Sequence, residues 1–285
     1  MVKGMEDKLF NVVIFTILTL VGLAAILPIL YVVSVSLTPY AEVLKNGGYV
    51  IFPKSITFAA YKQMLGDAAI WNSLKITVFV TVFGTAINLL LTTLLAYPLS
   101  RKSLPHRSLF MMMIIITLLF SGGLIPTYLV VKNTGLIDTL WALILPNAIW
   151  SFNVIIMKSF FENLPEEIFE SARMDGAGEF RTLWQIALPL SVPSVLTIGL
   201  FYAVGHWNQF FQAIMYITDR QLFPMQVIIR ELLMLSQSTD NAEVMVPTVT
   251  MQMSAVVIAS IPIIAVYPFL QRHFTKGMLL GSIKG

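Results

Sequence analysis

The chain has 285 residues, of which 57% are hydrophobic and only 12% are charged, about half the charged share of a typical soluble domain. A mean hydropathy of +0.81 excludes a soluble globular fold and a disordered chain, since a single core could not bury so much apolar surface. The absence of cysteine excludes disulfide scaffolds and thiolate chemistry, and the net charge of +3 is small.

Six stretches of at least 19 residues contain no Asp, Glu, Lys or Arg. A transmembrane helix needs about 20 mostly apolar residues to cross the hydrocarbon core, and a helix satisfies its own backbone hydrogen bonds in lipid. The sequence therefore predicts an all-α integral membrane protein, a single domain over residues 1–285, with six transmembrane helices at about 10–36, 72–99, 108–131, 139–160, 191–216 and 249–270.

The distribution of Lys and Arg predicts the orientation of these spans. With the N-terminus in the cytoplasm, the inner segments carry 11 of these residues and the outer segments carry 7. The short loop Arg101–Arg107 and the tail after Leu270 show the excess most clearly, and short segments follow the positive-inside rule best. Both termini are therefore expected in the cytoplasm, with the first span retained rather than cleaved as a signal peptide.

The inner segment 161–190 is too long for a simple connector, and it contains residues typical of helix starts, helix ends and turns in a regular order. Pro165 suits the first turn of a helix, and the acidic residues that follow it suit the positive end of the helix dipole. Asp175-Gly176 is typical of a stop and turn, and a second short helix is expected over 179–187, before Pro189. The pattern predicts a helix–turn–helix on the cytoplasmic face, with a structured connector as the alternative.

A distinctive sequence surrounds this turn. The stretch Glu170-Ser-Ala-Arg-Met-Asp175-Gly176-Ala177 is followed by Ile186-Ala-Leu188-Pro189. This arrangement resembles the EAA motif of ABC importer permeases, in which Glu-Ala-Ala and a glycine precede Ile-x-Leu-Pro. Ser171 replaces the first alanine of the motif, which exchanges one small residue for another.

Other stretches strengthen the resemblance. Trp207-Asn208-Gln209-Phe210 looks like the Trp-Asn-x-Phe of carbohydrate-importer permeases, and the tail 271–285 is similar to the C-terminal signature of the MalG-like branch. The stretches 120–128 and 135–142 resemble a sub-branch that includes permeases for complex oligosaccharides, among them alginate and other uronate chains.

The resemblance covers essentially the whole chain and implies the type I, MalG-like permease fold. It implies a permease subunit of the bacterial cytoplasmic membrane that forms half of a heterodimeric pore and imports a carbohydrate, an oligosaccharide of the uronate or alginate kind being the sub-branch expectation. The implied partners, besides membrane lipid, are a second homologous permease, two ATPase subunits and an extracytoplasmic sugar-binding protein, towards which the outer loop 217–248 would reach. No nucleic acid is expected as a partner.

The nucleotide is expected on the partner subunits and not on this chain. A P-loop needs a Gly-Lys pair, and every adjacent pair of these residues here runs Lys-Gly. ATP and Mg would therefore be bound by the ATPases. The chain itself is expected to be neither an enzyme nor the holder of a cofactor.

In the family, the cytoplasmic helix–turn–helix forms the coupling helix, which sits in a cleft of the ATPase. The resemblance therefore implies coupling roles for six residues: Glu170, Ser171, Ala172, Asp175, Gly176 and Ala177. Glu170 would pair with a basic group of the ATPase, Asp175-Gly176 would shape the turn, and the alanines would permit close approach. The competing interpretation is a solvated acidic face.

A sugar site needs aromatic faces for the ring surfaces and amides or hydroxyls for the ring oxygens. Polar side chains at membrane depth usually face the interior of the bundle. The fifth span and three amides of other spans supply such residues: Tyr202, His206, Trp207, Asn208, Gln209, Asn88, Asn147 and Asn153. For each of them, a hydrogen bond between helices is the competing role. No metal site is expected, because the other two histidines belong to the cytoplasmic side.

Two other function classes compete with the importer. An ion-coupled secondary transporter of a small polar solute would need carboxylates inside the membrane, and the six charge-free stretches hold none. An integral-membrane enzyme would need a catalytic cluster near the membrane surface, and the sequence offers no paired carboxylates, histidine cluster or nucleophile–base set. The secondary transporter is kept as the alternative.

Overall fold

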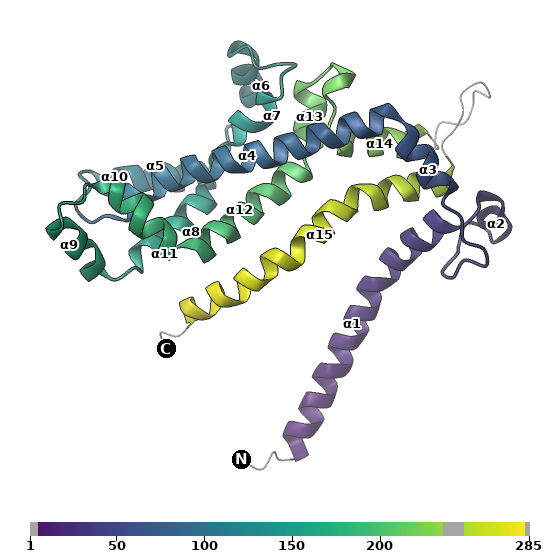
Figure 1. Cartoon of the computed structure of the whole chain (residues 1–285), viewed down its shortest axis with the longest axis horizontal. Coiled ribbons are helices and arrows are strands. Elements are labelled where there is room, and N and C mark those ends of the chain that lie inside the picture. Colours follow the sequence, from purple (N-terminus) through teal and green to yellow (C-terminus); the bar gives the residue numbers. More distant parts are fainter. Residues whose placement is uncertain (1–4, 236–247, 283–285) are drawn as a thin grey trace. The chain divides into compact units, whose positions relative to one another are not determined.

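A computed structural model describes residues 5–235 and 248–282, and side chains are described over residues 9–234 and 248–266 (Figure 1). All regular secondary structure in these ranges is helical. The motif-bearing tail 271–285 and much of the outer loop 217–248 therefore lie outside the residues whose side chains are described.

Three helices of the described chain are long and apolar enough to cross a membrane by themselves. They are α1 (Met5–Leu37), α4 (Ala68–Ser100) and α15 (Val249–Ser282). These helices contain the first, second and sixth predicted spans. Proline lies inside α1 and α4, at Pro28 and Pro98, without ending either helix.

The other predicted spans are interrupted. Three pairs of helices pass the same length and hydropathy test only when the two members are taken together, and each pair is bent by more than 40°. With each bent pair counted as one span, the described residues hold up to six candidate spans by length and composition. With the bent pairs left out, the three long helices remain.

The first interruption lies in the stretch 108–131, where one continuous helix was expected. Helix α5 (Arg107–Leu119) and helix α6 (Leu124–Asn133) meet at 114°. The break falls on Phe120-Ser-Gly-Gly123, and Gly123 has a φ of +87°, a conformation that L side chains rarely adopt. Two glycines within an apolar run therefore divide the predicted helix.

The second interruption lies in the stretch 139–160. Helix α7 (Trp141–Ile144) continues into a short 3-10 turn, η1 (Leu145–Asn147), and meets α8 (Ser151–Glu162) at 55°. Pro146 lies at the start of the 3-10 turn. Proline lacks the backbone N–H that an α-helix would need at this position, so α7 ends before it, and the bend follows at 148–150.

The third bend separates the inner segment from the fifth span. Helix α10 (Glu179–Thr182), the π-helical turn η2 (Leu183–Ala187) and α11 (Leu188–Leu190) meet α12 (Val192–Trp207) at 84°. Helix α13 (Phe211–Tyr216) follows after a further break at 208–210. The predicted span 191–216 is thus two helices, and the second short helix of the inner segment contains a π-turn.

The described residues fall into two compact units. The first unit lies within Met1–Trp71 and Ile229–Ile261, and the second lies within Asn72–Ile228 and Pro262–Gly285. The first unit contains α1, α2 (Tyr40–Lys45), α3 (Ala59–Gly66) and parts of α14 (Met225–Leu235) and α15.

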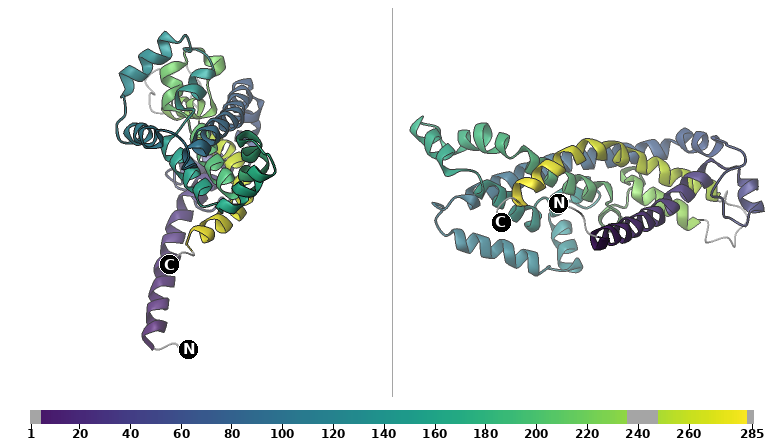
Figure 2. Two further views of the ribbon diagram at one scale, coloured as in Figure 1. Left: turned by 90° about the vertical axis from the view of Figure 1, so that its left-hand side faces the viewer. Right: turned by 90° about the horizontal axis from the view of Figure 1, so that it is seen from below.

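The second unit carries the main core. Buried side chains of α4, α8, α9 (Glu166–Met174), η2 and α12 form one apolar cluster, with Met157, Phe161 and Tyr202 among its largest members. Figures 1 and 2 show α4, α8 and α12 running alongside one another, with α9 and α10 together at one end of the unit. A smaller cluster joins α6, α7 and α13.

Asp138 ties two loops of the second unit together. Its backbone φ is +59°, and its carboxylate accepts hydrogen bonds from the hydroxyl and the amide of Thr218 and, at 3.1 Å, from the amide of Asp219. Its own amide donates to the Tyr216 carbonyl at 2.8 Å. The hydrogen bond from the Thr218 hydroxyl, followed by those from the two amides, lowers the pKa of Asp138.

We expect Asp138→Asn to raise hydrogen–deuterium exchange at Thr218 and Asp219, because an amide cannot replace the charged acceptor of three donors. In the wild type, a lowered pKa means that the carboxylate stabilises the fold above its unfolded pKa of about 4 and loses this effect as pH falls through the folded value. The protection of the Thr218 and Asp219 amides against exchange should therefore be constant from about pH 5 to 8 in the wild type. Asp67→Asn, which alters a carboxylate bonded to the Ala69 amide in the first unit, is the matched control. Unchanged exchange in Asp138→Asn would contradict the assignment.

Candidate functional site

The inner segment begins with the helix that the sequence predicts. Pro165 precedes α9, and Glu166 and Glu167 occupy its first turn, where carboxylates complement the helix dipole. Phe169 is buried and Glu170 is exposed. The exposed Ser171 hydroxyl donates back to the Glu167 carbonyl at 2.9 Å. The helix therefore presents its carboxylates outward and attaches through its apolar side.

The predicted turn is present at the end of α9. The amide of Gly176 donates to the Arg173 carbonyl at 3.0 Å, and the amide of Ala177 donates to the Ala172 carbonyl at 2.9 Å. This pair of bonds is the Schellman ending of a helix. It requires a left-handed residue, and Gly176 has a φ of +75°. Asp175 is exposed at the same turn.

The six predicted coupling residues divide into two groups. Glu170, Ser171, Asp175 and Gly176 are exposed. Ala172 is buried within its own unit, so its small side chain serves packing inside the chain, and Ala177 is partly buried.

Large apolar side chains stand out around the same turn. Met174 is 89% exposed and Phe180 is 70% exposed, and Trp184 is also exposed. Apolar side chains gathered on a protruding element, next to acidic ones, are typical of a surface that binds another protein. We name the exposed set Glu170, Met174, Asp175, Gly176, Phe180 and Trp184 the turn surface.

A cluster of charged and aromatic side chains holds this segment to α4. The guanidinium carbon of Arg101 lies 3.4 Å from the ring centroid of Phe169 and 4.6 Å from that of Tyr97. The Tyr97 hydroxyl donates to the Glu179 carboxylate at 2.8 Å, and Arg173 pairs with the same carboxylate at 3.3 Å. A cavity of about 480 Å³, lined in part by Tyr97, Arg101 and Glu179, adjoins the cluster.

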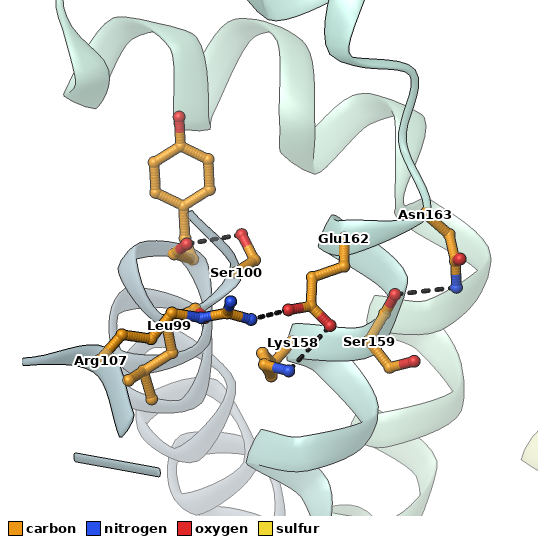
Figure 3. Close-up of polar contacts among 8 residues, drawn as sticks. Leu99, Ser100, Arg107, Lys158, Ser159, Glu162 and Asn163 are labelled. Carbon is orange, nitrogen blue, oxygen red and sulfur yellow. Dashed lines mark hydrogen bonds and ion pairs between the residues drawn. The ribbon is translucent and has the colours of Figure 1, made fainter. Parts of the chain in front are cut away.

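A second polar cluster joins α4, α5 and α8 (Figure 3). Arg107 donates to the Leu99 carbonyl at 2.7 Å and forms an ion pair with Glu162, which also pairs with Lys158 at 2.8 Å. The Asn163 amide donates to the Ser159 carbonyl at 2.9 Å nearby. Arg107, at the start of α5, therefore links the ends of α4 and α8, and Lys158 adds a second cation to Glu162 within α8.

Inside the bundle, the predicted polar residues lie close together. Asn88 of α4 and His206 of α12 are joined by a hydrogen bond of 3.0 Å, and the Asn88 amide also reaches the Asn147 carbonyl at 3.4 Å. Gly84 makes this approach possible, because a Cβ there would lie 2.6 Å from the His206 ring.

A second set of contacts lies one turn further along the same helices. The Tyr202 hydroxyl is 2.7 Å from the Thr92 hydroxyl and accepts a bond of 3.0 Å from the Trp150 amide. The rings of Trp150 and Tyr202 are 5.0 Å apart. Gly205 allows the Trp150 ring to approach, since a Cβ there would lie 2.5 Å from it.

Some buried polar atoms of this network have no hydrogen-bond partner in the described part of the protein. They are Asn88 Oδ1, His206 Nδ1, Gln209 Oε1 and both side-chain polar atoms of Asn153. Gln209 is held by its other end, which donates to the Leu143 carbonyl at 2.7 Å. Unpaired buried polar atoms are rare in proteins. The His206 and Gln209 side chains lie close enough to interact with each other, so Asn153 is the clearest unpaired group of the set.

Two of the predicted substrate residues lie apart from this network. Trp207 lines an apolar groove of about 610 Å³ between α4, α12 and the Pro262–Val266 part of α15. Asn208 is exposed, and its amide donates to the Val204 carbonyl at 2.9 Å. The structure therefore brings Asn88, Asn147, Tyr202, His206 and Gln209 into contacts between elements of the bundle, places Trp207 at the groove and leaves Asn208 exposed.

Sequence patterns alone do not single out Gly84, Thr92, Tyr97, Arg101 or Glu179. Gly84 stands four residues before Asn88, so both lie on one face of the predicted helix. This spacing could have indicated that Gly84 lies beside the partner of Asn88. In the sequence, Arg101 counts only as one of the charges that set the orientation. Among the residues described, no group of three or more His, Cys, Asp or Glu side chains could hold a metal ion.

Comparison with known proteins gives consistent results. The sequence matches, over residues 7–280, the family described as "Binding-protein-dependent transport system inner membrane component". It is 47% identical over 283 residues to Protein LplC of Bacillus subtilis, covering 98% of this chain and 96% of that one. It is 42% identical over 287 residues to the polygalacturonan/rhamnogalacturonan transport system permease protein YtcP of the same species, covering 99% and 100%.

A solved structure is also similar. It is the crystal structure of a bacterial ABC transporter involved in the import of the acidic polysaccharide alginate, and one of its chains superposes with a TM-score of 0.88 at 32% identity. The similarity covers 95% of this chain and 98% of that chain.

We expect Gly84→Ala to destabilise the bundle by about 1–3 kcal/mol, because its Cβ would overlap the His206 ring. The measurement is the thermal unfolding midpoint of the detergent-solubilised chain. Gly22→Ala, on α1 with open space around it, is the matched control and should have no such effect.

The double variant Gly84→Ala/His206→Ala should recover part of the loss caused by Gly84→Ala, because it removes the ring that the new methyl group meets. Strictly additive losses would show that the two residues are not in contact.

Proposed function

The chain belongs to the family of binding-protein-dependent transport system inner membrane components, and from this membership we propose that it is the permease subunit of an ATP-driven carbohydrate importer. In this proposal it forms half of a heterodimeric pore with a second, homologous permease. Two ATPase subunits bind ATP and Mg below the membrane, and an extracytoplasmic binding protein delivers the sugar from above.

The proposed cargo is an oligosaccharide that contains uronic acids. One relative is named for polygalacturonan and rhamnogalacturonan transport, and the similar solved structure is from an importer of alginate. Both names refer to acidic polysaccharides. Both matches cover nearly the whole of each chain. This extent supports the proposal that the present chain transports the same class of substrate.

In the proposed topology, six spans cross the bacterial cytoplasmic membrane as one transmembrane domain, and both termini lie in the cytoplasm. The bent pairs α5–α6 and α7–α8 then each count as one span, and α12 with α13 forms the fifth span, while α10 and α11 stay on the cytoplasmic side. The excess of Lys and Arg in the segments assigned to the cytoplasm supports this orientation.

The observation that carries the proposal is the turn surface. A Schellman turn holds α9 and α10 in a fixed relation, and Met174 and Phe180 project beside Glu170 at that turn. A protruding surface with apolar side chains beside a carboxylate suits a cleft on another subunit that offers both apolar and basic contacts. We assign this surface to the ATPase, whose closure would move α9 and α10 and switch the pore between its two accesses.

The proposed substrate path follows the unpaired polar atoms of the bundle. Asn153 offers a donor and an acceptor that helix packing does not use. Tyr202 and His206 are already bonded to neighbouring helices, so we assign them to holding the path in shape. Trp207 and Asn208 would meet the sugar only outside this network.

We expect Glu170→Lys to abolish uptake while the chain stays in the membrane, because it reverses the charge of an exposed carboxylate of the turn surface. The assay is uptake of a labelled oligogalacturonate by proteoliposomes that contain both permeases, the ATPases and the binding protein. Glu166→Lys, which reverses an exposed charge in the first turn of the same helix, is the control and should keep most of the uptake.

Normal uptake by Glu170→Lys would refute the coupling role. Uptake that needs an ion gradient and proceeds without ATP would favour the secondary-transporter alternative over the importer.

A further inference from the structure

Arg101 is held by aromatic faces in an unusual way. Its guanidinium lies against the rings of Phe169 and Tyr97, at 3.4 Å and 4.6 Å from their centroids. Its Nε and Nη2 atoms are buried and have no hydrogen-bond partner among the described residues. The ring faces of Phe169 and Tyr97 therefore stabilise the cation at this site, through an interaction that strengthens when water is excluded.

This contact joins two elements that are far apart in the sequence. Arg101 directly follows the last residue of α4, and Phe169 lies on the buried side of α9. The hydrogen bond from Tyr97 to Glu179 adds a second link, from α4 to α10. The segment that carries the turn surface is thus attached to the end of one long helix.

We propose that Arg101 is the positioning residue through which a displacement of α9 is passed to α4. This inference rests on the proposed function, in which the ATPases move α9. Helix α4 also carries Asn88 and Thr92, which contact His206 and Tyr202 of α12. The route from Arg101 to Asn88 is about 20 Å along a single helix.

The proposal makes the planar guanidinium essential, and not the positive charge alone. An ammonium group is a compact point charge and cannot lie flat on a ring. Arg101→Lys and Arg101→Met should therefore both lower the number of sugars imported per ATP hydrolysed, by about tenfold for Arg101→Met. ATP hydrolysis by the assembled complex should continue. Lys102→Met, which removes the exposed neighbouring cation, is the control and should keep the wild-type ratio.

A second measurement reads the position of α9 without transport. The chain contains no cysteine, so Met174→Cys gives one site for a spin label on the full chain. Arg101→Met should make this label more mobile than it is in the otherwise unchanged chain, and Lys102→Met should not. An unchanged label mobility together with an unchanged import ratio would overturn the proposal. If the wild-type complex shows no ATP-driven uptake, the proposed function fails, and the label mobility still decides the role of Arg101 in holding α9.

A separate surface, in the first unit, carries an independent inference. The loop 46–58 between α2 and α3 exposes several large apolar side chains: Tyr49 at 81%, Phe52 at 84%, and also Ile51, Ile56 and Phe58. Val50 of the same loop is buried against Val35 and Val43, so the loop has apolar side chains on both its inner and its outer face. Within the unit, the ring of Tyr49 lies 6.2 Å from that of Tyr31 and the ring of Phe58 lies 6.2 Å from that of Tyr61, and both side chains still leave most of their surface exposed.

The position of this loop along α1 sets its depth. The Tyr31 hydroxyl donates to the Gly48 carbonyl at 3.0 Å, and the Thr57 amide donates to the Leu37 carbonyl at 2.8 Å. The apolar part of α1, Leu9–Leu37, has 29 residues, or about 43 Å of helix, against a hydrocarbon core of about 30 Å. Because charged residues precede Leu9, the last turns of α1 extend beyond the core, and the loop lies at that level.

We infer that the loop 46–58 binds the headgroup layer of the bilayer. Aromatic side chains concentrate at this depth in membrane proteins, and exposed Lys45 and Lys54 can contact lipid phosphates there. The loop would fix the height and tilt of α1 by holding its end at the interface.

Spin labels at Phe52→Cys and Phe58→Cys, on the full chain in lipid bilayers, test the inference. Collision with dissolved oxygen and with a water-soluble nickel complex gives the depth of each label. Both labels should fall between Leu20→Cys, in the middle of α1, and Met174→Cys, on the turn surface. Values equal to those of Met174→Cys would place the loop in water, and protection from both reagents would show that protein covers it. Either result would overturn the inference.

Discussion

Polar groups that enter the hydrocarbon must find their partners inside the protein, and this constraint organises the second unit. Water is absent at that depth, so each unpaired donor or acceptor costs free energy. Asn88, Thr92, Tyr202 and His206 meet part of this demand by bonding to one another's helices or to the backbone, although Asn88 Oδ1 and His206 Nδ1 have no hydrogen-bond partner among the described residues. The same requirement explains why the breaks in the predicted spans lie next to side chains that can complete the backbone, as Trp150 shows by donating to Tyr202.

The inner segment is stabilised differently, because one of its faces is buried and the other is exposed. Phe169 and Leu183 anchor it in the main core, whereas Met174 and Phe180 project outward. The Schellman turn at Gly176 ends α9 with backbone hydrogen bonds, and the ion pair between Arg173 and Glu179 joins α9 to α10. The backbone and this ion pair hold the turn, while Met174 and Phe180 stay exposed.

Hydropathy and local turn chemistry predicted much of this arrangement. The long helices α1, α4 and α15 follow from charge-free stretches, and the turn at Asp175-Gly176 follows from a glycine placed after an acidic helix. The breaks at 120–123 and 208–210 were not predicted, because apolar residues on both sides hide them from a hydropathy argument. The pairing of Arg101 with Phe169 could not be predicted from spacing, since 68 positions separate the two residues and only the fold brings them together.

The two glycine contacts in the bundle restrict how it can move. His206 occupies the space beside Gly84, and Trp150 occupies the space beside Gly205, so α4, α12 and the start of α8 are interlocked by rings that fill the room left by missing side chains. Sliding or rotating any one of these helices alone would drive a ring into a neighbouring backbone. A rearrangement that keeps these contacts must therefore carry the three helices as a rigid body. Its hinges then fall where the helices are already interrupted, at 120–123, Ser191 and 208–210.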